Sequence, residues 1–288
     1  MQETLVIPLY GRKMCSERYP SLYRDETALR LIDQIDYDFS LLSEKSKSLM
    51  QQFGFLEAAM RQNDLAWEVR DYLRQHPNAA VVNLGCGLDD TGRSCDNGTC
   101  KIYNLDFPGV IAVRDALLPA GEREENVACD LNDMSWFRRI DASGGAVFFA
   151  AGVYYYFLTE QVQALVQGMA EAFPGGRLVF DAANQKAVRL MLKTWIRTAE
   201  IQDVGAYFAV SDAKRSFPAG RRACAFPAAV ICWATATAAT TANNGRLTEH
   251  KRSPLPRVSA AAGFAGFTPD CIFPRTCCTA SKTRCCRI

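Results

Sequence analysis

Residues 81–90, VVNLGCGLDD, decide the fold, because a short apolar run leads directly into a turn that contains two glycines. The run at 81–84 is typical of a strand that is covered on both faces of a parallel sheet. Gly85 and Gly87 have no Cβ, so a ligand can lie against the backbone of the turn. Nucleotides bind at such strand ends in α/β folds. We therefore expect an adenosine-containing ligand here.

Acidic residues stand at the ends of the next two predicted strands. Asp106 closes IYNLD and Asp130 closes NVACD. An acidic residue about 20 positions after the glycine turn holds ribose hydroxyls in such folds, and a second carboxylate can accept from an adenine amino group. Asp106 has an alternative role as a helix cap, since Pro108 follows it, and Asp130 can simply be a turn residue. Together the three strand ends offer the polar groups that an adenosine needs.

The turn also indicates which adenosine ligand fits. Asp90 occupies the position of the third glycine in a dinucleotide fingerprint, where a pyrophosphate would meet the helix N-terminus. Asp89 and Asp90 would repel a pyrophosphate but tolerate a cationic ligand, such as a sulfonium with an amino group. A plain tight turn remains the alternative reading of G-x-G alone. The pattern disfavours a nicotinamide dinucleotide.

Strand and helix patterns alternate through much of the chain. We predict strands at 81–84, 101–107, 125–131, 145–157, 177–184 and 206–210, and helices at 23–35, 53–75, 110–118, 133–139, 159–172 and 185–201. This alternation is typical of an α/β fold with a doubly wound, mostly parallel sheet. No stretch reaches the ~18 apolar residues of a membrane span, and the first residues lack a secretory signal, so we expect a cytoplasmic location.

The composition changes after residue 212. Of the 31 acidic residues, two lie beyond this point, against 12 of the 33 basic residues and seven of the 12 cysteines. The segment 213–288 shows no sustained helical or strand period. We hypothesise a shift of reading frame near residues 212–215, which would leave the sheet without its last strands. The tail cysteines lack C-x-x-C spacing, so no metal site is predicted, and its basic charge supports no specific nucleic-acid site.

The motifs LVIPLYGR, VVNLGCGLD, LDFPGVIAVRDALLP and FPGGRLVFD, in this order and spacing, resemble the leucine carboxyl methyltransferase-related O-methyltransferases, in the polyketide branch. The resemblance covers roughly residues 4–212. It implies a class I, S-adenosylmethionine-dependent methyltransferase fold. The expected parts are an N-terminal helical cap at 1–78, a cofactor-binding core at 79–212 and an atypical tail at 213–288.

The resemblance also implies a cofactor site. An arginine pairs with the cofactor carboxylate, glycines lie along its methionine and ribose, and acidic residues hold its ribose and adenine. The residues at these positions are Arg61, Gly85, Gly87, Asp89, Asp106, Asp130, Leu131 and Gly152. A planar guanidinium suits a carboxylate, although Arg61 can also be read as a solvated helix residue. Ala151 stands where the founding members have a glutamate, which weakens the case for methylation of a protein C-terminus.

Two groups of aromatic and basic residues are candidates for substrate contact. Tyr10, Arg12 and Tyr19 belong to the segment that the family folds over its site. Tyr154–Tyr156 follow the fourth strand, at the side of the sheet where ligands bind, although such a run more often packs in a core.

The expected activity is methyl transfer from S-adenosylmethionine to a carboxylate or phenolic oxygen of a small polyketide-like or aromatic molecule. No catalytic residue is predicted. His76 and His250 are poorly placed to act as a base, which favours a substrate that is already ionised. The alternatives are a cofactor-binding remnant without activity and, less favoured, a nicotinamide-dependent oxidoreductase. The oligomeric state is not predicted.

Overall fold

The computed structural model describes residues 3–191, 207–210 and 228–233. The strands of this part are β1 (Ala80–Leu84), β2 (Lys101–Asp106), β3 (Glu124–Ala128), β4 (Ala146–Ala150), β5 (Arg177–Ala183) and β6 (Ala228–Trp233). They form one sheet in the order β3-β2-β1-β4-β5-β6, and every neighbouring pair is parallel. The predicted α/β class with a doubly wound parallel sheet is confirmed.

The register of the sheet brings the strand ends together. Leu84, the last residue of β1, lies opposite Leu105 of β2 and Ala150 of β4. Asp106 of β2 lies opposite Ala128 of β3. The loops that follow β1, β2, β3 and β4 therefore leave the sheet at one edge, which is where parallel sheets bind ligands.

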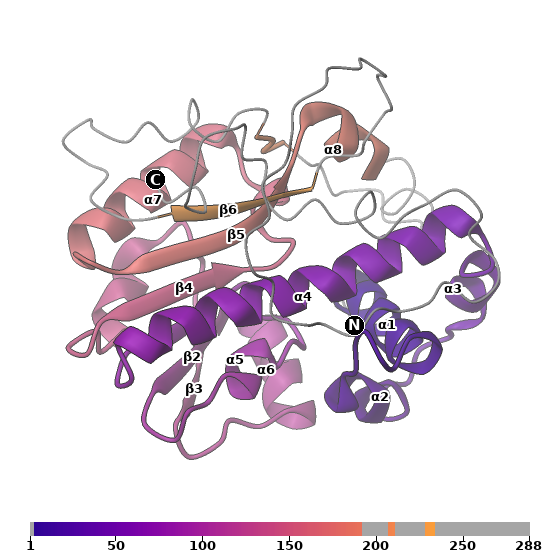
Figure 1. Ribbon diagram of the computed structural model, residues 1–288, viewed down its shortest axis with the longest axis horizontal. Helices are drawn as coiled ribbons and strands as arrows, with labels where there is room; N and C mark the ends of the chain where they lie inside the picture. Colours follow the sequence, from indigo (N-terminus) through magenta and orange to yellow (C-terminus); the bar gives the residue numbers. More distant parts are fainter. Residues whose placement is uncertain (1–2, 192–206, 211–227, 234–288) are drawn as a thin grey trace, which may run out of the picture.

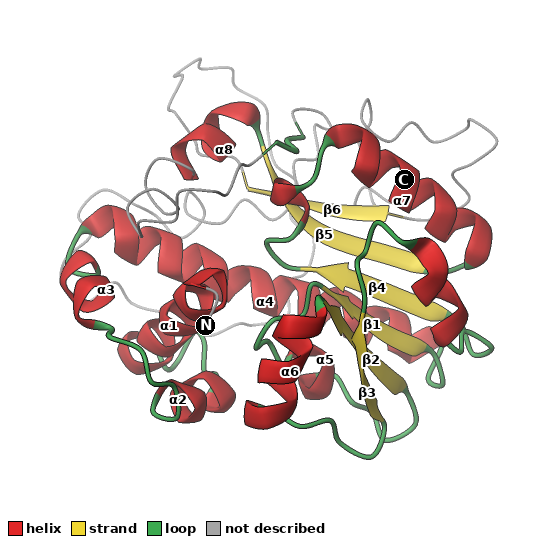
Figure 2. Cartoon of the chain, turned by 180° about the vertical axis from the view of Figure 1, so that it is seen from behind, coloured by secondary structure: helices red, strands yellow, loops and turns green. Residues whose placement is uncertain are grey.

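Helices cover both faces of the sheet. They are α1 (Glu3–Arg18), α2 (Glu26–Ile32), α3 (Ser40–Lys45), α4 (Leu49–Gln75), α5 (Thr91–Ser94), α6 (Pro108–Leu117), α7 (Thr159–Ala172) and α8 (Gln185–Met191), with the 3₁₀ helices η1 (Met134–Arg139) and η2 (Tyr154–Tyr156). Figure 1 shows α4 across one face, and Figure 2 shows α7 on the other; α6 lies on the α4 side, where Arg114 bonds Asn126. Each face has its own core, one around Leu65 and Val69 of α4 and one around Leu165 and Met169 of α7.

The N-terminal helices form a cap at the carboxyl edge of the sheet (Figure 1). Its apolar core joins Leu9 of α1, Leu31 of α2 and Phe55 of α4, and it reaches Leu88 of the glycine turn. Helix α4 begins at the N-cap Ser48, whose side chain accepts from the Gln51 amide. Because α4 starts in the cap and continues across the sheet, it joins the two parts.

Four predicted elements differ in the structure. The strand predicted at 145–157 ends at Ala150, and Tyr154–Tyr156 form the 3₁₀ helix η2. Residues 206–210 are not a strand where the structure describes them, at 207–210. This segment lies against the core through single backbone bonds, from Tyr207 N to Tyr155 O (2.7 Å) and from Val210 N to Ala183 O (3.0 Å). Residues 133–139 form a 3₁₀ turn rather than an α-helix. The helix predicted at 185–201 is described only as far as Met191.

The edge of β5 is paired, although a frameshifted tail was expected to leave the sheet without its last strands. Strand β6, from the compositionally distinct tail, runs parallel to β5 and pairs from Leu178↔Ala228 to Ala183↔Trp233. The other tail residues lie outside the described part of the chain. Among the helices that the structure describes, none is both long enough and apolar enough to cross a membrane.

Candidate functional site

The glycine turn after β1 has the shape that the sequence predicts. Gly85 and Gly87 adopt φ values of 66° and 47°, which disfavour residues with a Cβ. A Cβ at Gly85 would lie 2.6 Å from a methyl carbon of Val153. The glycines therefore allow the turn to lie close against the loop that follows β4.

Asp106 stands beside this turn, at the end of β2. Its Oδ2 accepts from the Gly87 amide and its Oδ1 from the Phe107 amide, both at 2.8 Å. Burial raises the pKa of Asp106, against the opposite effect of these two amides. Each carboxylate oxygen has a further lone pair, so two hydroxyl groups of a ligand can still be accepted.

Arg114 of α6 holds the carbonyl groups of the turn. The sequence did not point to this residue. Its Nη1 donates to the carbonyl oxygens of Gly87 (2.9 Å) and Asp89 (2.7 Å), and its Nε donates to Asn126. The Arg114 side chain is buried. It satisfies carbonyls that would otherwise lie unpaired beneath the site.

The Asp89 carboxylate, predicted to contact the cofactor, is directed into the protein. It accepts from Arg12 Nη1 (3.2 Å), Asn83 Nδ2 (3.1 Å), and the amide and hydroxyl of Thr91 (3.1 and 2.7 Å). The Thr91 hydroxyl also lies 2.9 Å from Gln62 Oε1 of α4, an alternative acceptor for its single hydrogen. Asp89 thus fixes the shape of the turn through its neighbours.

Arg12 joins the cap to the turn. Its Nη1 is 3.0 Å from Asp25 Oδ2 and its Nη2 donates to the Leu88 carbonyl at 3.0 Å, in addition to the Asp89 contact. Its side chain is 3% exposed. Asp25 also caps α2 by accepting from the Ala28 amide. Because Arg12 has these buried partners, its geometry favours a structural role over the predicted substrate contact.

A second buried ion pair lies on the other side of the site. Asp181 of β5 accepts from Arg61 Nη1 (3.0 Å), from the Tyr155 hydroxyl (3.1 Å) and from the Gly152 amide (2.6 Å). A Cβ at Gly152, where φ is 70°, would lie 2.9 Å from Arg61 Nη2. Burial raises the pKa of Glu57, one turn before Arg61 on α4, and Asp181 adds to this effect while Arg61 opposes it.

The predicted adenine side is more open. Asp130 is exposed, and its Oδ1 accepts from the amide and the side-chain nitrogen of Asn132. Leu131 is buried. Phe107, directly after Asp106, is 51% exposed. This ring is a further candidate for contact with a planar base.

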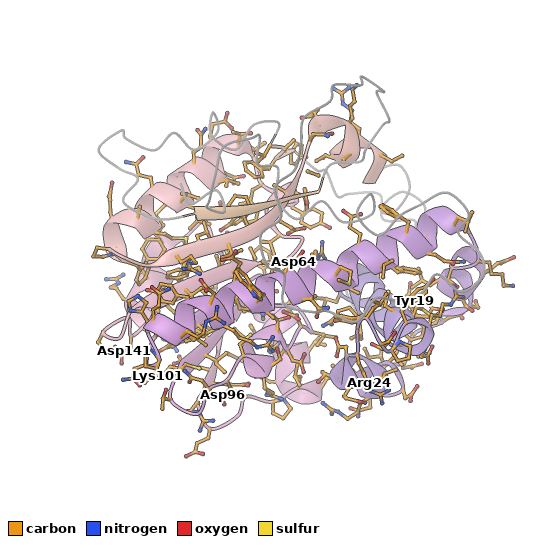
Figure 3. All side chains as sticks on the ribbon, viewed as in Figure 1. Tyr19, Arg24, Asp64, Asp96, Lys101 and Asp141 are labelled. Atoms are coloured by element: carbon orange, nitrogen blue, oxygen red, sulfur yellow. The ribbon has the colours of Figure 1, made fainter. Side chains whose placement is uncertain are left out.

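The tyrosines predicted to contact substrate occupy different surroundings. Tyr10 is buried and stacks on Phe39 in the cap core, and Tyr19 follows α1, within the cap in Figure 3. Tyr154 is buried in the core, and burial raises its pKa. Tyr155 bonds Asp181, whereas Tyr156 is 39% exposed. Of this run, Tyr156 is the residue that a ligand reaches most easily.

Sequence reasoning missed Asp181, and a signal for it was present. The carboxylate lies inside the apolar run RLVFDAA, and a charge that is buried in a strand requires a partner. The partner Arg61 lies 120 positions away in the chain, so sequence alone could not name it. Among the described residues, no cluster of three metal-ligating side chains is present.

The model of the leucine carboxyl methyltransferase family matches residues 6–170, which is more than half of the chain. The chain belongs to this family. It is 27% identical over 183 residues to the tetracenomycin polyketide synthesis O-methyltransferase of Streptomyces glaucescens. The match spans 63% of this chain and 66% of that protein. The predicted resemblance is confirmed at the level of the family.

Two solved structures illustrate the similarities to other methyltransferases. Human N-acetylserotonin methyltransferase, in complex with S-adenosylmethionine, is 14% identical, with a TM-score of 0.39 over 72% of this chain and 62% of that one. Magnesium protoporphyrin IX methyltransferase of Synechocystis PCC 6803, with bound S-adenosylhomocysteine, is 14% identical, with a TM-score of 0.40 over 67% of this chain and 87% of that one.

The leucine carboxyl methyltransferase family uses S-adenosylmethionine, and the residues at the site fit this cofactor. Gly85 and Gly87 give the turn a left-handed backbone without side chains, and Asp106 has free acceptor capacity for ribose hydroxyls. The Nε of Arg61 is buried without a partner among the described residues, so this guanidinium has donors to spare for a carboxylate.

Proposed function

We propose that this chain transfers a methyl group from S-adenosylmethionine to an oxygen atom of a small aromatic or polyketide-like molecule. The observation that carries the proposal is the arrangement at one edge of the sheet. A glycine turn without side chains lies between an acidic strand end at Asp106 and the part-buried guanidinium of Arg61. Such a set complements a nucleoside at one end and an amino-acid carboxylate at the other.

The cofactor supplies an electrophilic methyl group on a sulfonium. The task of the chain is to hold an acceptor oxygen in line with that methyl group and to exclude water. Asp106 and Asp130 would orient the nucleoside, and Arg61 would hold the carboxylate. The cap, fixed to the turn by Arg12, would cover the site, and Tyr156 would meet the acceptor.

An acceptor that is already ionised needs no base, whereas a phenol gains from one. His76 ends α4 and stacks on Tyr72 at 4.5 Å between ring centroids, far along the helix from the cap. Turnover should therefore be highest with an acceptor that is already ionised at neutral pH.

The test is a turnover assay of the full chain with S-adenosylmethionine and a panel of aromatic acids and phenols, with detection of S-adenosylhomocysteine. Product formation with at least one member supports the proposal. Cofactor binding without turnover across the panel would instead favour the cofactor-binding remnant. Binding of a nicotinamide dinucleotide in preference to S-adenosylmethionine would contradict the proposal.

A methyl acceptor at a protein C-terminus is the second candidate, because the family takes its name from that reaction. Ala151 replaces the glutamate expected before Gly152, and this weakens the candidate. A peptide that ends in a free leucine carboxylate belongs in the same assay panel, since its methylation would decide in favour of this activity.

A further inference from the structure

Asp181 lies at the centre of the Arg61 side of the site and is assigned no function by the family match. Its side chain is 2% exposed and contacts three separate elements. Oδ2 accepts from Arg61 of α4 and from Tyr155 of η2, and Oδ1 accepts from the Gly152 amide in the loop after β4. One carboxylate therefore fixes a helix, a turn and a loop around one strand.

The ion pair with Asp181 leaves hydrogen-bond donors of the Arg61 guanidinium available. Arg61 gives Nη1 to Asp181, while its Nε is buried without a partner among the described residues. Its Nη2 lies beside Gly152, where the missing side chain leaves room. A buried guanidinium with spare donors requires an acceptor, and a carboxylate matches its planar geometry.

We propose that Asp181 is a positioning residue that holds Arg61, together with the Gly152 loop, in the orientation that receives the carboxylate of the cofactor. This inference rests on the proposed function. Asp181 acts through Arg61 and does not need to touch the cofactor. An unpaired arginine side chain has many rotamers, and its ordering would oppose cofactor binding. The ion pair with Asp181 already restricts the Arg61 side chain, so less conformational entropy is lost when the cofactor binds.

Tyr155 extends this role. It donates its hydroxyl to the same oxygen of Asp181 that pairs with Arg61, so it limits the positions which the carboxylate can adopt. Burial strongly raises the pKa of Tyr155, and the Asp181 charge adds to the effect. The hydroxyl therefore stays protonated and remains a donor. Its predicted substrate contact is replaced here by a supporting contact.

The experiment compares two ligands of the full chain by calorimetry. S-adenosylhomocysteine carries the amino-acid carboxylate, whereas 5′-methylthioadenosine has the same nucleoside and thioether without it. We expect Asp181→Asn to weaken S-adenosylhomocysteine binding about 10- to 100-fold, as for a lost hydrogen bond to a charged group. Methylthioadenosine affinity should change less than about threefold, and Asp181→Glu should restore part of the loss.

The matched control is Asp141→Asn. Asp141 pairs with Lys101 at the sheet end away from the cap (Figure 3), where both side chains are about half exposed. This variant should bind both ligands like the wild type. If Asp181→Asn does not fold, Tyr155→Phe gives the test, because it removes one bond to Asp181 and should lower the affinity for S-adenosylhomocysteine alone.

An equal loss of affinity for both ligands would overturn the inference, because Asp181 would then support the site only as a whole. An unchanged preference for S-adenosylhomocysteine in Asp181→Asn would also overturn it. If the wild-type chain binds neither ligand, the proposed function itself fails, and the inference fails with it.

Discussion

Replacement of Arg12 by methionine tests how the cap is held to the glycine turn. Methionine keeps the apolar stem and most of the volume but removes three hydrogen bonds, to Asp25, Asp89 and the Leu88 carbonyl. Two carboxylates whose side chains are 6% and 11% exposed then face each other without a cation. The removal of one partner from a buried ion pair costs about 3–5 kcal/mol.

Neither carboxylate loses all its donors. Asp25 keeps the Ala28 amide and the Tyr23 hydroxyl, and Asp89 keeps Asn83 and Thr91. We therefore expect the lower end of the range, about 3 kcal/mol, which is still a large part of the 5–15 kcal/mol that stabilises a typical domain.

Urea unfolding of the full chain, followed by circular dichroism, measures this loss. Arg18→Met is the control, since Arg18 is exposed at the end of the same helix and should change stability by less than about 0.5 kcal/mol. Arg12→Lys should fall between the two, because an ammonium keeps the charge but not the fork that spans three acceptors. Equal stability of the Arg12→Met and Arg18→Met variants would refute the reasoning.

The remaining predictions concern the site and the tail. Gly152→Ala should weaken S-adenosylhomocysteine binding at least tenfold in calorimetry, because the new Cβ would meet the Arg61 guanidinium. Gly98→Ala should leave binding unchanged, since Gly98 has the same left-handed backbone but open space around it. Equal effects of the two substitutions would contradict the contact with Arg61. The pKa of Asp106 is raised, and in the proposed site its ionised form accepts ribose hydroxyls. Cofactor affinity should therefore fall as the pH drops through the range just above the ordinary carboxyl pKa of about 4. The same fall in the Asp106→Asn variant would exclude this residue as the cause. The pKa of Cys129 is about 11, raised by burial and nearby carboxylates, so iodoacetamide at pH 8 should label it slowly in peptide mass spectrometry, and rapid labelling would show that it is not buried in this way. Sequencing of the locus should reveal family-like sequence in another frame beyond residue 212, and its absence would end the frameshift hypothesis.

The sequence predicted those parts of the fold in which the local pattern and the tertiary context agree. The run at 81–84 and the helix at 159–172 were found because their apolar periods match the faces that they bury. Helix α1 was not found, since Pro8 lies within it and no clear apolar stripe marks its length. The stretch at 206–210 has strand-like composition, but residues 207–210 contact the core through isolated backbone bonds instead of a ladder.

The candidate site also has features that the local sequence encodes and contacts that it does not. The left-handed glycine turn and the place of Asp106 beside it were predictable, because both lie within a short stretch whose backbone shape depends on residue type. The contact of Asp89 with Arg12 was not predicted, because Arg12 lies 77 positions away. The long-range pairs depend on packing of the cap against the sheet, and no local pattern encodes that.

The two buried ion pairs, Arg12 with Asp89 and Arg61 with Asp181, explain why the cap and the sheet form one site. Each pair joins a cap helix to a strand end or its turn, on opposite sides of the glycine backbone. Apolar contacts alone would tolerate small shifts of the cap, because they are not directional. A buried charge has a steep cost when its partner moves, so these pairs define the position of the cap more narrowly than its apolar core can. The geometry of the proposed cofactor site therefore depends on α1 and α4 as directly as on the strand ends.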